Sequence, residues 1–161
     1  PMWAAAAALV VLVMAVLPVL TARSSTVLAA QLTADHVKCF TAFRPREATG
    51  GDPRAAEQQL EAYGWRVHVP PSSPDDGLHL LGVRRCLYAE GTMPHVMYEA
   101  NGEPFSLFTL KGSEHAPAMV TTLGHQCRIW RHDGRTFVLV GSKDAGAAFT
   151  RVADYVQREA R

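Results

Sequence analysis

Residues 94–110, PHVMYEANGEPFSLFTL, set the architecture of this 161-residue chain. Two runs of alternating side chains flank Asn101-Gly102, a dipeptide that favours the type I′ turn of a β-hairpin. Asp133-Gly134 is a second dipeptide of this kind, and Glu90-Gly91 marks a third turn. Tight turns make successive strands antiparallel, so we expect a sheet of about five to seven strands, arranged mainly as a meander. The expected strands cover residues 78–88, 94–100, 103–110, 118–122, 126–131 and 135–140.

Helical patterns lie on either side of these strands in the sequence. Residues 27–43 repeat buried-type side chains at three- and four-residue spacings, which is typical of an amphipathic helix. A second helix is expected over residues 52–63 and a third over residues 143–159, while residues 65–69 alternate as one further short strand. The predicted fold class is therefore α+β, with two helices, an antiparallel sheet and a C-terminal helix behind an apolar N-terminal segment.

That N-terminal segment has the composition of a membrane anchor. The first 22 residues contain no Lys, Arg, Asp or Glu, and Met2 to Leu20 is long enough as a helix to cover most of a bilayer's hydrocarbon layer. Trp3 lies at one end, where an indole favours the headgroup level, and Arg23 marks the other. Pro18 falls in the last turn. The sequence thus predicts a transmembrane helix over residues 1–22.

A cleaved secretory signal is the rival interpretation, with Leu28-Ala29-Ala30 as its small-residue cleavage site. The long apolar run and the lack of a basic segment before it favour the anchor. The sequence therefore predicts two parts, a single-pass anchor at 1–22 and an extracytoplasmic α+β domain at 23–161.

Charge and motif content exclude several function classes. The chain has 16 basic and 15 acidic residues, which gives no positive excess of the kind that nucleic-acid binding requires. It contains no glycine-rich phosphate loop, no Gly-x-Ser-x-Gly elbow and no His-Glu-x-x-His helix. We therefore expect a protein that is not an enzyme, carries no cofactor and binds no nucleic acid.

The three cysteines are the first candidate functional residues. In an oxidising compartment, one disulfide and one leftover thiol is the natural arrangement of an odd number. Cys39 and Cys86 are the preferred pair, either as a structural disulfide or as a redox switch, because they join the first helix to a central strand. Cys86 with Cys127 is the alternative pair.

Two sets of side chains are candidate metal ligands. His36 and Cys39 lie at i and i+3 on one helical face, and a zinc site would need further ligands from Cys86, Cys127, His95 or His125. Packing, a disulfide or local hydrogen bonds are the simpler interpretation of the helical pair. The second set shares one face of a strand and offers soft ligands to a copper(I) ion: Met93, His95 and Met97.

The order of features resembles the outer half of bacterial transmembrane anti-sigma factors. The similar segments are residues 30–40 (AQLTADHVKCF), 63–70 (YGWRVHVP), 84–88 (RRCLY), 95–98 (HVMY), 106–108 (SLF), 123–125 (LGH) and 137–140 (FVLV). The family's His-x-x-x-Cys-x-x-Cys zinc motif is absent from this chain, so no zinc ligand or sigma-binding residue carries over. Because the chain opens at Pro1, we expect sequence upstream. The resemblance implies a sensor or protein-contact domain outside the bacterial inner membrane, with the N-terminus inside.

An accessory or scaffold subunit of a larger membrane complex, for example a photosynthetic or respiratory one, is the alternative. In the first case the partner is a sigma factor bound through the missing upstream domain. In the second, the partners are other membrane or periplasmic proteins. Contacts would then come from the anchor and from aromatic side chains such as Trp65 and Trp130. A periplasmic copper-binding module is the third possibility.

Overall fold

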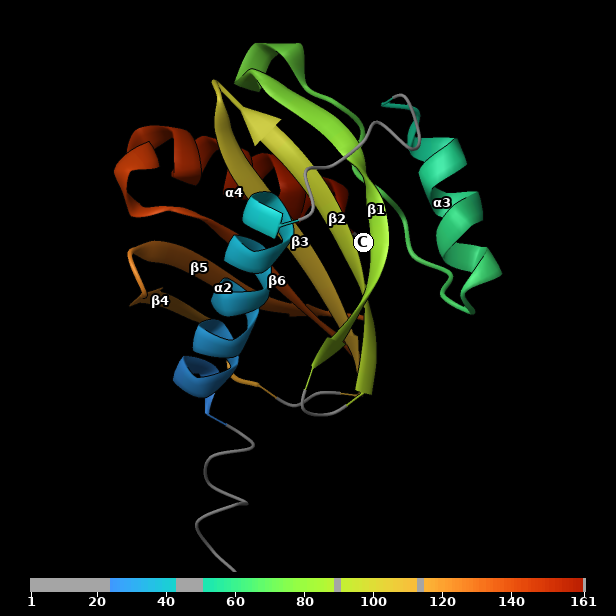
Figure 1. Cartoon of the computed structure of the whole chain (residues 1–161), viewed down its shortest axis with the longest axis horizontal. Helices are drawn as coiled ribbons and strands as arrows, with labels where there is room; N and C mark the ends of the chain where they lie inside the picture. Colours follow the sequence, from blue (N-terminus) through green and yellow to red (C-terminus); the bar gives the residue numbers. More distant parts are fainter. Residues whose placement is uncertain (1–23, 43–50, 89–90, 113–114, 161) are drawn as a thin grey trace, which may run out of the picture.

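The computed structural model describes residues 24–42, 51–88, 91–112 and 115–160. Within these ranges the chain forms three α-helices and one six-stranded antiparallel sheet (Figure 1). The helices are α2 (Ser25–Ala42), α3 (Pro53–Ala62) and α4 (Ala147–Glu159), and the strands are β1 (Leu78–Tyr88), β2 (Gly91–Ala100), β3 (Glu103–Lys111), β4 (Ala118–Thr122), β5 (His125–His132) and β6 (Arg135–Ser142).

The strand order is β1-β2-β3-β6-β5-β4, and each neighbouring pair is antiparallel. The sheet therefore consists of two three-stranded meanders joined through β3 and β6, a non-consecutive pair that the sequence did not indicate. Tight turns fix the pairing only within each meander. The connection between β3 and β4 is not a tight hairpin turn, so β3 is free to pair with β6.

The two type I′ hairpin turns that the sequence predicts are confirmed. Asn101 and Gly102 have φ of 53° and 81°, and Asp133 and Gly134 have 46° and 69°, as this turn requires at both central positions. Leu123-Gly124, with φ of 48° and 74°, makes a third turn of the same kind between β4 and β5. The Glu90-Gly91 turn includes a residue outside the described ranges.

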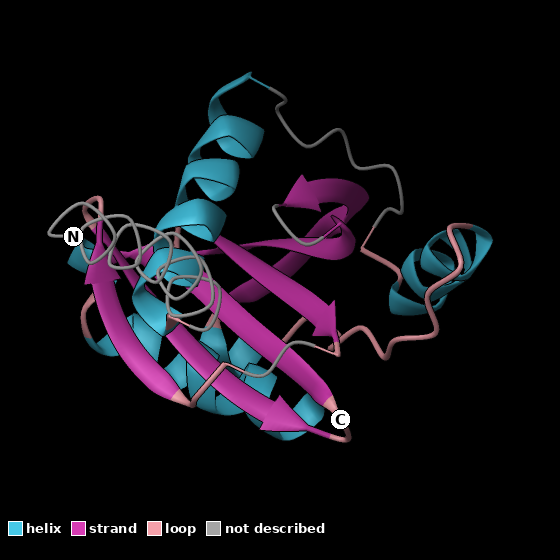
Figure 2. Cartoon of the chain, turned by 90° about the horizontal axis from the view of Figure 1, so that it is seen from below, coloured by secondary structure: helices cyan, strands magenta, loops and turns pink. Residues whose placement is uncertain are grey.

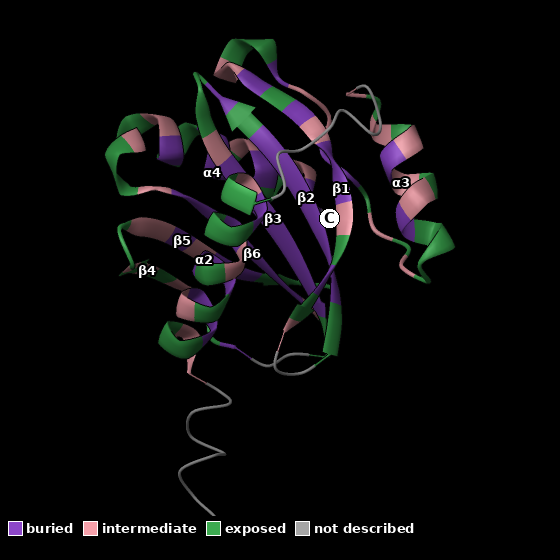
Figure 3. Cartoon of the chain, viewed as in Figure 1, coloured by how far each residue is buried: buried purple, intermediate pink, exposed green. Residues whose placement is uncertain are grey.

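Helices cover both faces of the sheet. Figure 2 shows α2 on one side and α4 on the other, and α3 lies beside β1. Alternate side chains of each strand therefore enter two separate cores. Burial follows this arrangement, with buried strand interiors and exposed outer helix surfaces (Figure 3).

One core fills the side of α3 and α4 and contains most of the large apolar side chains, including Tyr98, Phe105 and Phe149. Gly141 in β6 permits that packing, because a Cβ there would lie 2.6 Å from Phe105 and 3.1 Å from Phe149. The other core lies beneath α2 and contains all three cysteines together with Met93. The second core holds the groups of chemical interest.

The expected strand at residues 65–69 is wrong. The segment is extended but pairs with no strand in the described part of the chain. The backbone N–H of Val69 instead donates to the Glu57 side chain at 2.9 Å. The alternation of apolar and polar side chains over residues 65–69 has another cause. Trp65 and Val67 pack against the core of α3 and α4, and Val69 is fully buried in it.

The expected fold with a membrane-spanning helix, and the inner-membrane location that follows from it, are wrong for the part of the chain that the structure describes. None of the helices there is both long and apolar enough to cross a membrane. Residues 1–22 and the anchor residues Trp3, Pro18 and Arg23 lie outside the described residues. The fold is corrected to three helices with a six-stranded antiparallel sheet.

Candidate functional site

Four chemically reactive side chains converge between α2 and the β1-β2 hairpin. One ligand atom each from Asp35, Cys39, Cys86 and His95 lies within 4.8 Å of all the others. Cys39, Cys86 and His95 are buried, with exposed fractions of 1%, 5% and 0%. We call these four residues the thiol cluster. Two thiols, a carboxylate and an imidazole in one buried place can exchange protons, form a disulfide or bind a cation.

Helix and sheet geometry together assemble the thiol cluster. Asp35 and Cys39 are four residues apart on α2, so their side chains lie one above the other on the same helical face. Cys86 on β1 is the register partner of Met93, and His95 follows two positions along β2, on the same side of the sheet. The preceding bulge in β1, between Leu80 and Gly82, sets which side chains of that strand face α2.

Ser106 connects the thiol cluster to a second buried histidine. Its hydroxyl lies 2.7 Å from His95 Nε2 and 2.7 Å from His36 Nδ1, and His95 Nδ1 lies 3.4 Å from the Cys86 sulfur. A hydroxyl has one proton, so Ser106 donates to one imidazole and accepts from the other. The His36 ring then meets the partly exposed ring of His125 edge-on, with centroids 5.0 Å apart. A polar line thus runs from the thiols toward the surface.

Burial keeps both histidines of this line neutral. It lowers the pKa of His36 to about 3, with a smaller contribution from the neighbouring His125. It also lowers the pKa of His95 well below the usual value, assisted by His36 and Arg84. A neutral His95 presents one nitrogen with a proton and one with a lone pair.

The two thiols of the thiol cluster are electrostatically unequal. A hydrogen bond from the Cys86 thiol lowers the pKa of Cys39. Donating that bond raises the pKa of Cys86, and burial, a hydrogen bond with Asp35 and the charge of Asp35 raise it further. Cys39 is therefore the sulfur of the pair that holds a negative charge more readily.

Asp35 also reaches the surface. It lines a pocket of about 400 Å³ between α2 and the end of β1, where Lys38, Leu87 and Tyr88 form part of the wall. One carboxylate oxygen of Asp35, Oδ2, is buried without a hydrogen-bond partner among the described residues. The pocket thus gives small solutes a route to the carboxylate that borders both thiols.

The sequence anticipated part of this arrangement. The structure brings together Cys39, Cys86 and His95, and it holds all three cysteines as free thiols. It leaves His36 and His125 outside the thiol cluster. His36 bonds to Ser106 instead, and His125 Nδ1 lies 2.8 Å from its acceptor, the Leu123 carbonyl oxygen.

Cys127 lies elsewhere, with its sulfur 3.3 Å from the Thr33 hydroxyl. Its strand β5 is separated from β1 by β2, β3 and β6, and four strand spacings of about 4.8 Å put the two strands roughly 19 Å apart. A disulfide needs Cα atoms within about 7 Å, so the alternative pair of Cys86 with Cys127 is excluded.

The copper hypothesis concerns Met93, His95 and Met97, which are all buried on the α2 side of β2. Both ring nitrogens of His95 are directed to other groups, Nδ1 to Cys86 and Nε2 to Ser106. Copper binding by these three side chains stays a prediction.

Sequence reasoning missed Asp35 and Ser106 as members of the site. The signal for Asp35 was its position four residues before Cys39, which shares a helical face as well as His36 does. The only signal for Ser106 was that it is polar and stands between Phe105 and Leu107. The structure shows that β3 is buried at all three positions.

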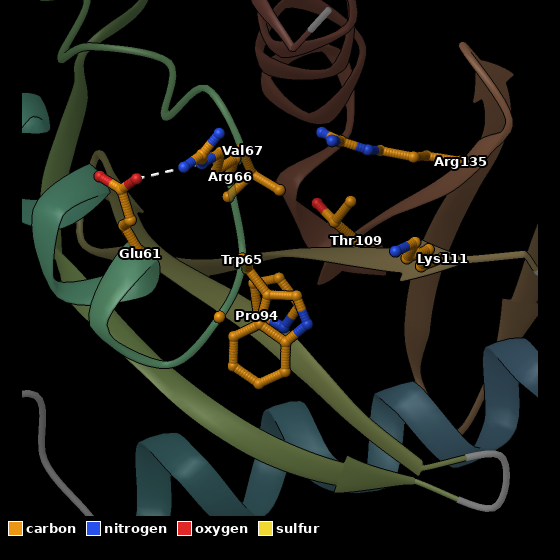
Figure 4. Close-up of a pocket in the computed structure, with 9 residues that line it drawn as sticks. Glu61, Trp65, Arg66, Val67, Pro94, Thr109, Lys111 and Arg135 are labelled. Carbon is orange, nitrogen blue, oxygen red and sulfur yellow. Dashed lines mark hydrogen bonds and ion pairs between the residues drawn. The ribbon is translucent and has the colours of Figure 1, made fainter.

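A second candidate site lies on the opposite face of the sheet. A pocket of about 400 Å³ is lined by Trp65 and Pro94 and by the cationic side chains of Lys111 and Arg135 (Figure 4). Arg66 also lines it but is paired with Glu61 at 3.1 Å. The pocket therefore combines an aromatic surface with positive charge.

Comparison with known proteins gives no identification. No protein-family model matches the chain, and no curated protein matches it.

Proposed function

We propose that this domain is a non-enzymatic redox sensor whose responsive element is the Cys39-Cys86 thiol pair. The observation that carries the proposal is the convergence of two buried thiols from different elements, α2 and β1, without a bond between them. A disulfide would tie α2 covalently to the sheet and close a loop of about 47 residues (86 minus 39). Its reduction would leave α2 held by packing alone, as in the structure with free thiols. The chemical state of two sulfur atoms would therefore control how firmly one surface helix is held.

The oxidant in this proposal is hydrogen peroxide, which is small enough to enter through the pocket beside Asp35. One sulfur attacks a peroxide oxygen and the O–O bond breaks, which yields a sulfenic acid and water. The second thiol then attacks the sulfenic sulfur, forms the S–S bond and releases a second water. Two thiols lose two electrons and two protons, and the peroxide is reduced to two waters.

The resemblance to the outer half of anti-sigma factors supports a regulatory output. In that family this half acts as a sensor or as a protein-contact module. We propose that oxidation changes how this domain contacts a regulatory partner protein. The burial of Cys39, Cys86 and His95 also supports a sensor over an enzyme, because it restricts the access of larger substrates to these atoms.

Peroxide treatment of the reduced protein, with a chelator present and peptide mapping under non-reducing conditions, tests the proposal. We expect a Cys39-Cys86 disulfide and a free thiol at Cys127. The Cys127→Ala variant should form the same disulfide, and Cys39→Ala should form none. Three free thiols after treatment that oxidises a small dithiol to completion would overturn the proposal.

Binding of an acidic segment of a partner protein is a second candidate function. Lys111 and Arg135 are directly opposite each other on β3 and β6, an arrangement of like charges that destabilises a sheet unless an anion offsets it. Trp65 beside them offers an aromatic anchor of the kind that dominates protein interfaces.

Titration with a short peptide that contains aspartates and one aromatic residue tests this candidate, with Trp65 fluorescence as the readout. Binding should weaken with salt and be lost in the Arg135→Glu variant. An equal affinity of Arg135→Glu and the parent protein would eliminate the candidate. The chain has three tryptophans, so the double variant Trp3→Phe/Trp130→Phe leaves Trp65 as the emitting residue and serves as the matched background.

A further inference from the structure

We infer that the reduced thiol cluster is a binding site for a thiophilic divalent cation of the zinc class, held by Asp35, Cys39, Cys86 and His95. The inference deepens the proposed function, on whose thiol pair it rests, because it names a ligand for the reduced state. Cys39, Cys86 and His95 are among the zinc candidates that the sequence indicated, and Asp35 takes the place of His36.

The donor set fits zinc in number and in kind. Structural zinc sites use four ligands in tetrahedral geometry, drawn from thiolates, imidazoles and carboxylates. Bond lengths of about 2.3 Å to sulfur and 2.0 Å to nitrogen put ligand atoms roughly 3.5 Å apart across a tetrahedron edge. The observed 3.4 Å between Cys86 Sγ and His95 Nδ1 is close to that value, and all four ligand atoms lie within 4.8 Å of one another. Small side-chain shifts would complete the tetrahedron.

His95 is oriented as a metal ligand. A ligating histidine usually donates its other ring N–H to a fixed acceptor, which sets the tautomer and the ring plane. The Ser106 hydroxyl at 2.7 Å from Nε2 provides that acceptor and donates its own hydrogen bond to His36 Nδ1. This arrangement leaves the lone pair of Nδ1 directed at Cys86. Stacking on Phe108, with centroids 4.3 Å apart, holds the imidazole ring further.

Asp35, whose carboxylate also interacts with the Cys86 thiol, provides a further observation. Its Oδ2 atom is buried and has no hydrogen-bond partner among the described residues, although buried polar atoms are nearly always satisfied. A cation between Asp35 and the two sulfurs would satisfy that oxygen. The pocket beside Asp35, Lys38 and Leu87 supplies the access route that a metal site needs.

The charges also balance. Two thiolates and one carboxylate carry three negative charges, so a divalent cation leaves one in excess. Arg84 and Lys38 both act electrostatically on Cys39, and Arg84 also acts on His95. Arg84 is the register partner of His95 on the neighbouring strand. A cationic side chain thus lies where the residual charge of the occupied site would be.

Cobalt(II) titration of the reduced, metal-free protein tests the inference, because Co²⁺ reports its ligands optically. We expect the visible bands of a tetrahedral ion together with a thiolate-to-cobalt charge-transfer band, and equimolar Zn²⁺ should abolish both. The spectrum of octahedral cobalt without a charge-transfer band would overturn the inference. This measurement uses the unmodified chain, so it does not depend on any variant folding.

Variants assign the ligands in a competition assay with a chromophoric zinc chelator. Ser106→Ala should weaken zinc binding by about 10- to 100-fold, the usual effect of removing the partner of a ligating histidine. Cys39→Ser should weaken it further, and Cys127→Ala, outside the thiol cluster, should leave it unchanged. An equal loss in Cys127→Ala and Cys39→Ser would contradict the assignment.

The two proposals fail separately. Zinc binding without peroxide-induced Cys39-Cys86 bridging would refute the redox sensor and leave the metal site. Disulfide formation with no tetrahedral cobalt spectrum would refute the metal site and leave the redox sensor. If both hold, bound zinc should slow the disulfide reaction, since the same sulfurs serve both.

Discussion

Ser106 links the two buried imidazoles beneath α2, and its hydroxyl satisfies a nitrogen on each of them. Ser106→Ala would leave His36 and His95 each with an unpaired buried nitrogen. Because an unsatisfied buried polar group costs about 1–3 kcal/mol, we expect the free energy of unfolding to fall by at least that amount. Denaturant unfolding of the metal-free protein measures the effect.

Thr41 provides the matched control, because its exposed hydroxyl donates to the Val37 carbonyl oxygen on the surface of α2. Thr41→Ala should change stability by less than about 0.5 kcal/mol. Equal stability changes in Ser106→Ala and Thr41→Ala would contradict the claim that the Ser106 hydroxyl satisfies two buried imidazole nitrogens.

The depressed pKa of His36 predicts acid sensitivity of the metal-free fold. In the unfolded chain His36 takes up a proton near the ordinary histidine pKa of 6.5, whereas in the folded protein it stays neutral down to about 3. Between these values the unfolded state binds the extra proton. The contribution of neutral His36 to the free energy of unfolding is therefore fully present above about pH 6.5. As the pH is lowered, the free energy of unfolding falls by about 1.4 kcal/mol per pH unit for this one group.

Chemical denaturation at a series of pH values measures this slope, and His36→Leu, which cannot take up the proton, is the comparison. Between roughly pH 6 and pH 4, the unfolding free energy of the variant should fall less steeply with decreasing pH, by the equivalent of about one bound proton. A slope identical to that of the parent protein would show that His36 does not carry the effect.

At the scale of elements, the cross-strand pair of Lys111 and Arg135 predicts an unusual gain in stability. Like charges directly opposite each other on antiparallel strands repel, by a few tenths of a kcal/mol up to about 1 kcal/mol. Lys111→Gln should therefore stabilise the domain at low ionic strength, and added salt should reduce the gain.

Thermal unfolding in low and high salt measures the difference. Lys143→Gln, at an exposed position in the turn before α4, removes the same charge without a cross-strand cation and should show no gain. A destabilised Lys111→Gln variant would indicate that the lysine has a favourable contact in the folded domain.

Local chemistry explains which elements the sequence could predict. The Asn101-Gly102 and Asp133-Gly134 turns need only the conformational freedom of their own residues, so their strands follow directly. Asp52, the first residue of the helix expected over residues 52–63, also acts locally: it is the N-cap of α3 and accepts from the Arg54 N–H at 2.9 Å. The pairing of β3 with β6 depends on contacts distant in sequence, and the alternation of residues 65–69 only mimics a strand.

The same distinction applies to the thiol cluster. The spacing of residues on α2 restricts which side chains share a face, but it cannot choose between His36 and Asp35 as the neighbour of Cys39. That choice depends on the rotation of α2 against the sheet, which packing sets. Trp130 shows the same limit: the sequence suggested an exposed contact residue, and the structure leaves it only 5% exposed.

At the scale of the whole molecule, the thiol cluster joins α2 to β1. Among the described elements, α2 is the only helix on its face of the sheet, and β1 is an edge strand. The oxidised protein should therefore be more stable than the reduced protein. In the chain-entropy model, a disulfide that closes the loop between Cys39 and Cys86 contributes about 3–4 kcal/mol to the free energy of unfolding. Unfolding of oxidised and reduced samples of Cys127→Ala, which excludes other disulfides, measures the difference.

A stability of the oxidised form that is equal to or lower than that of the reduced form would mean that the bridge strains the native structure. Oxidation would then favour release of α2 from the sheet and not its retention. The direction of the stability change thus fixes the direction of the proposed signal.

The central claim is that four side chains from α2, β1 and β2 act as one chemical site. X-ray absorption at the zinc edge of the reduced, zinc-loaded protein tests it most directly, because it counts the ligands by element. The account predicts two sulfur atoms at about 2.3 Å and two nitrogen or oxygen atoms at about 2.0–2.2 Å. A first coordination shell of oxygen and nitrogen alone, or one with a single sulfur, would contradict it.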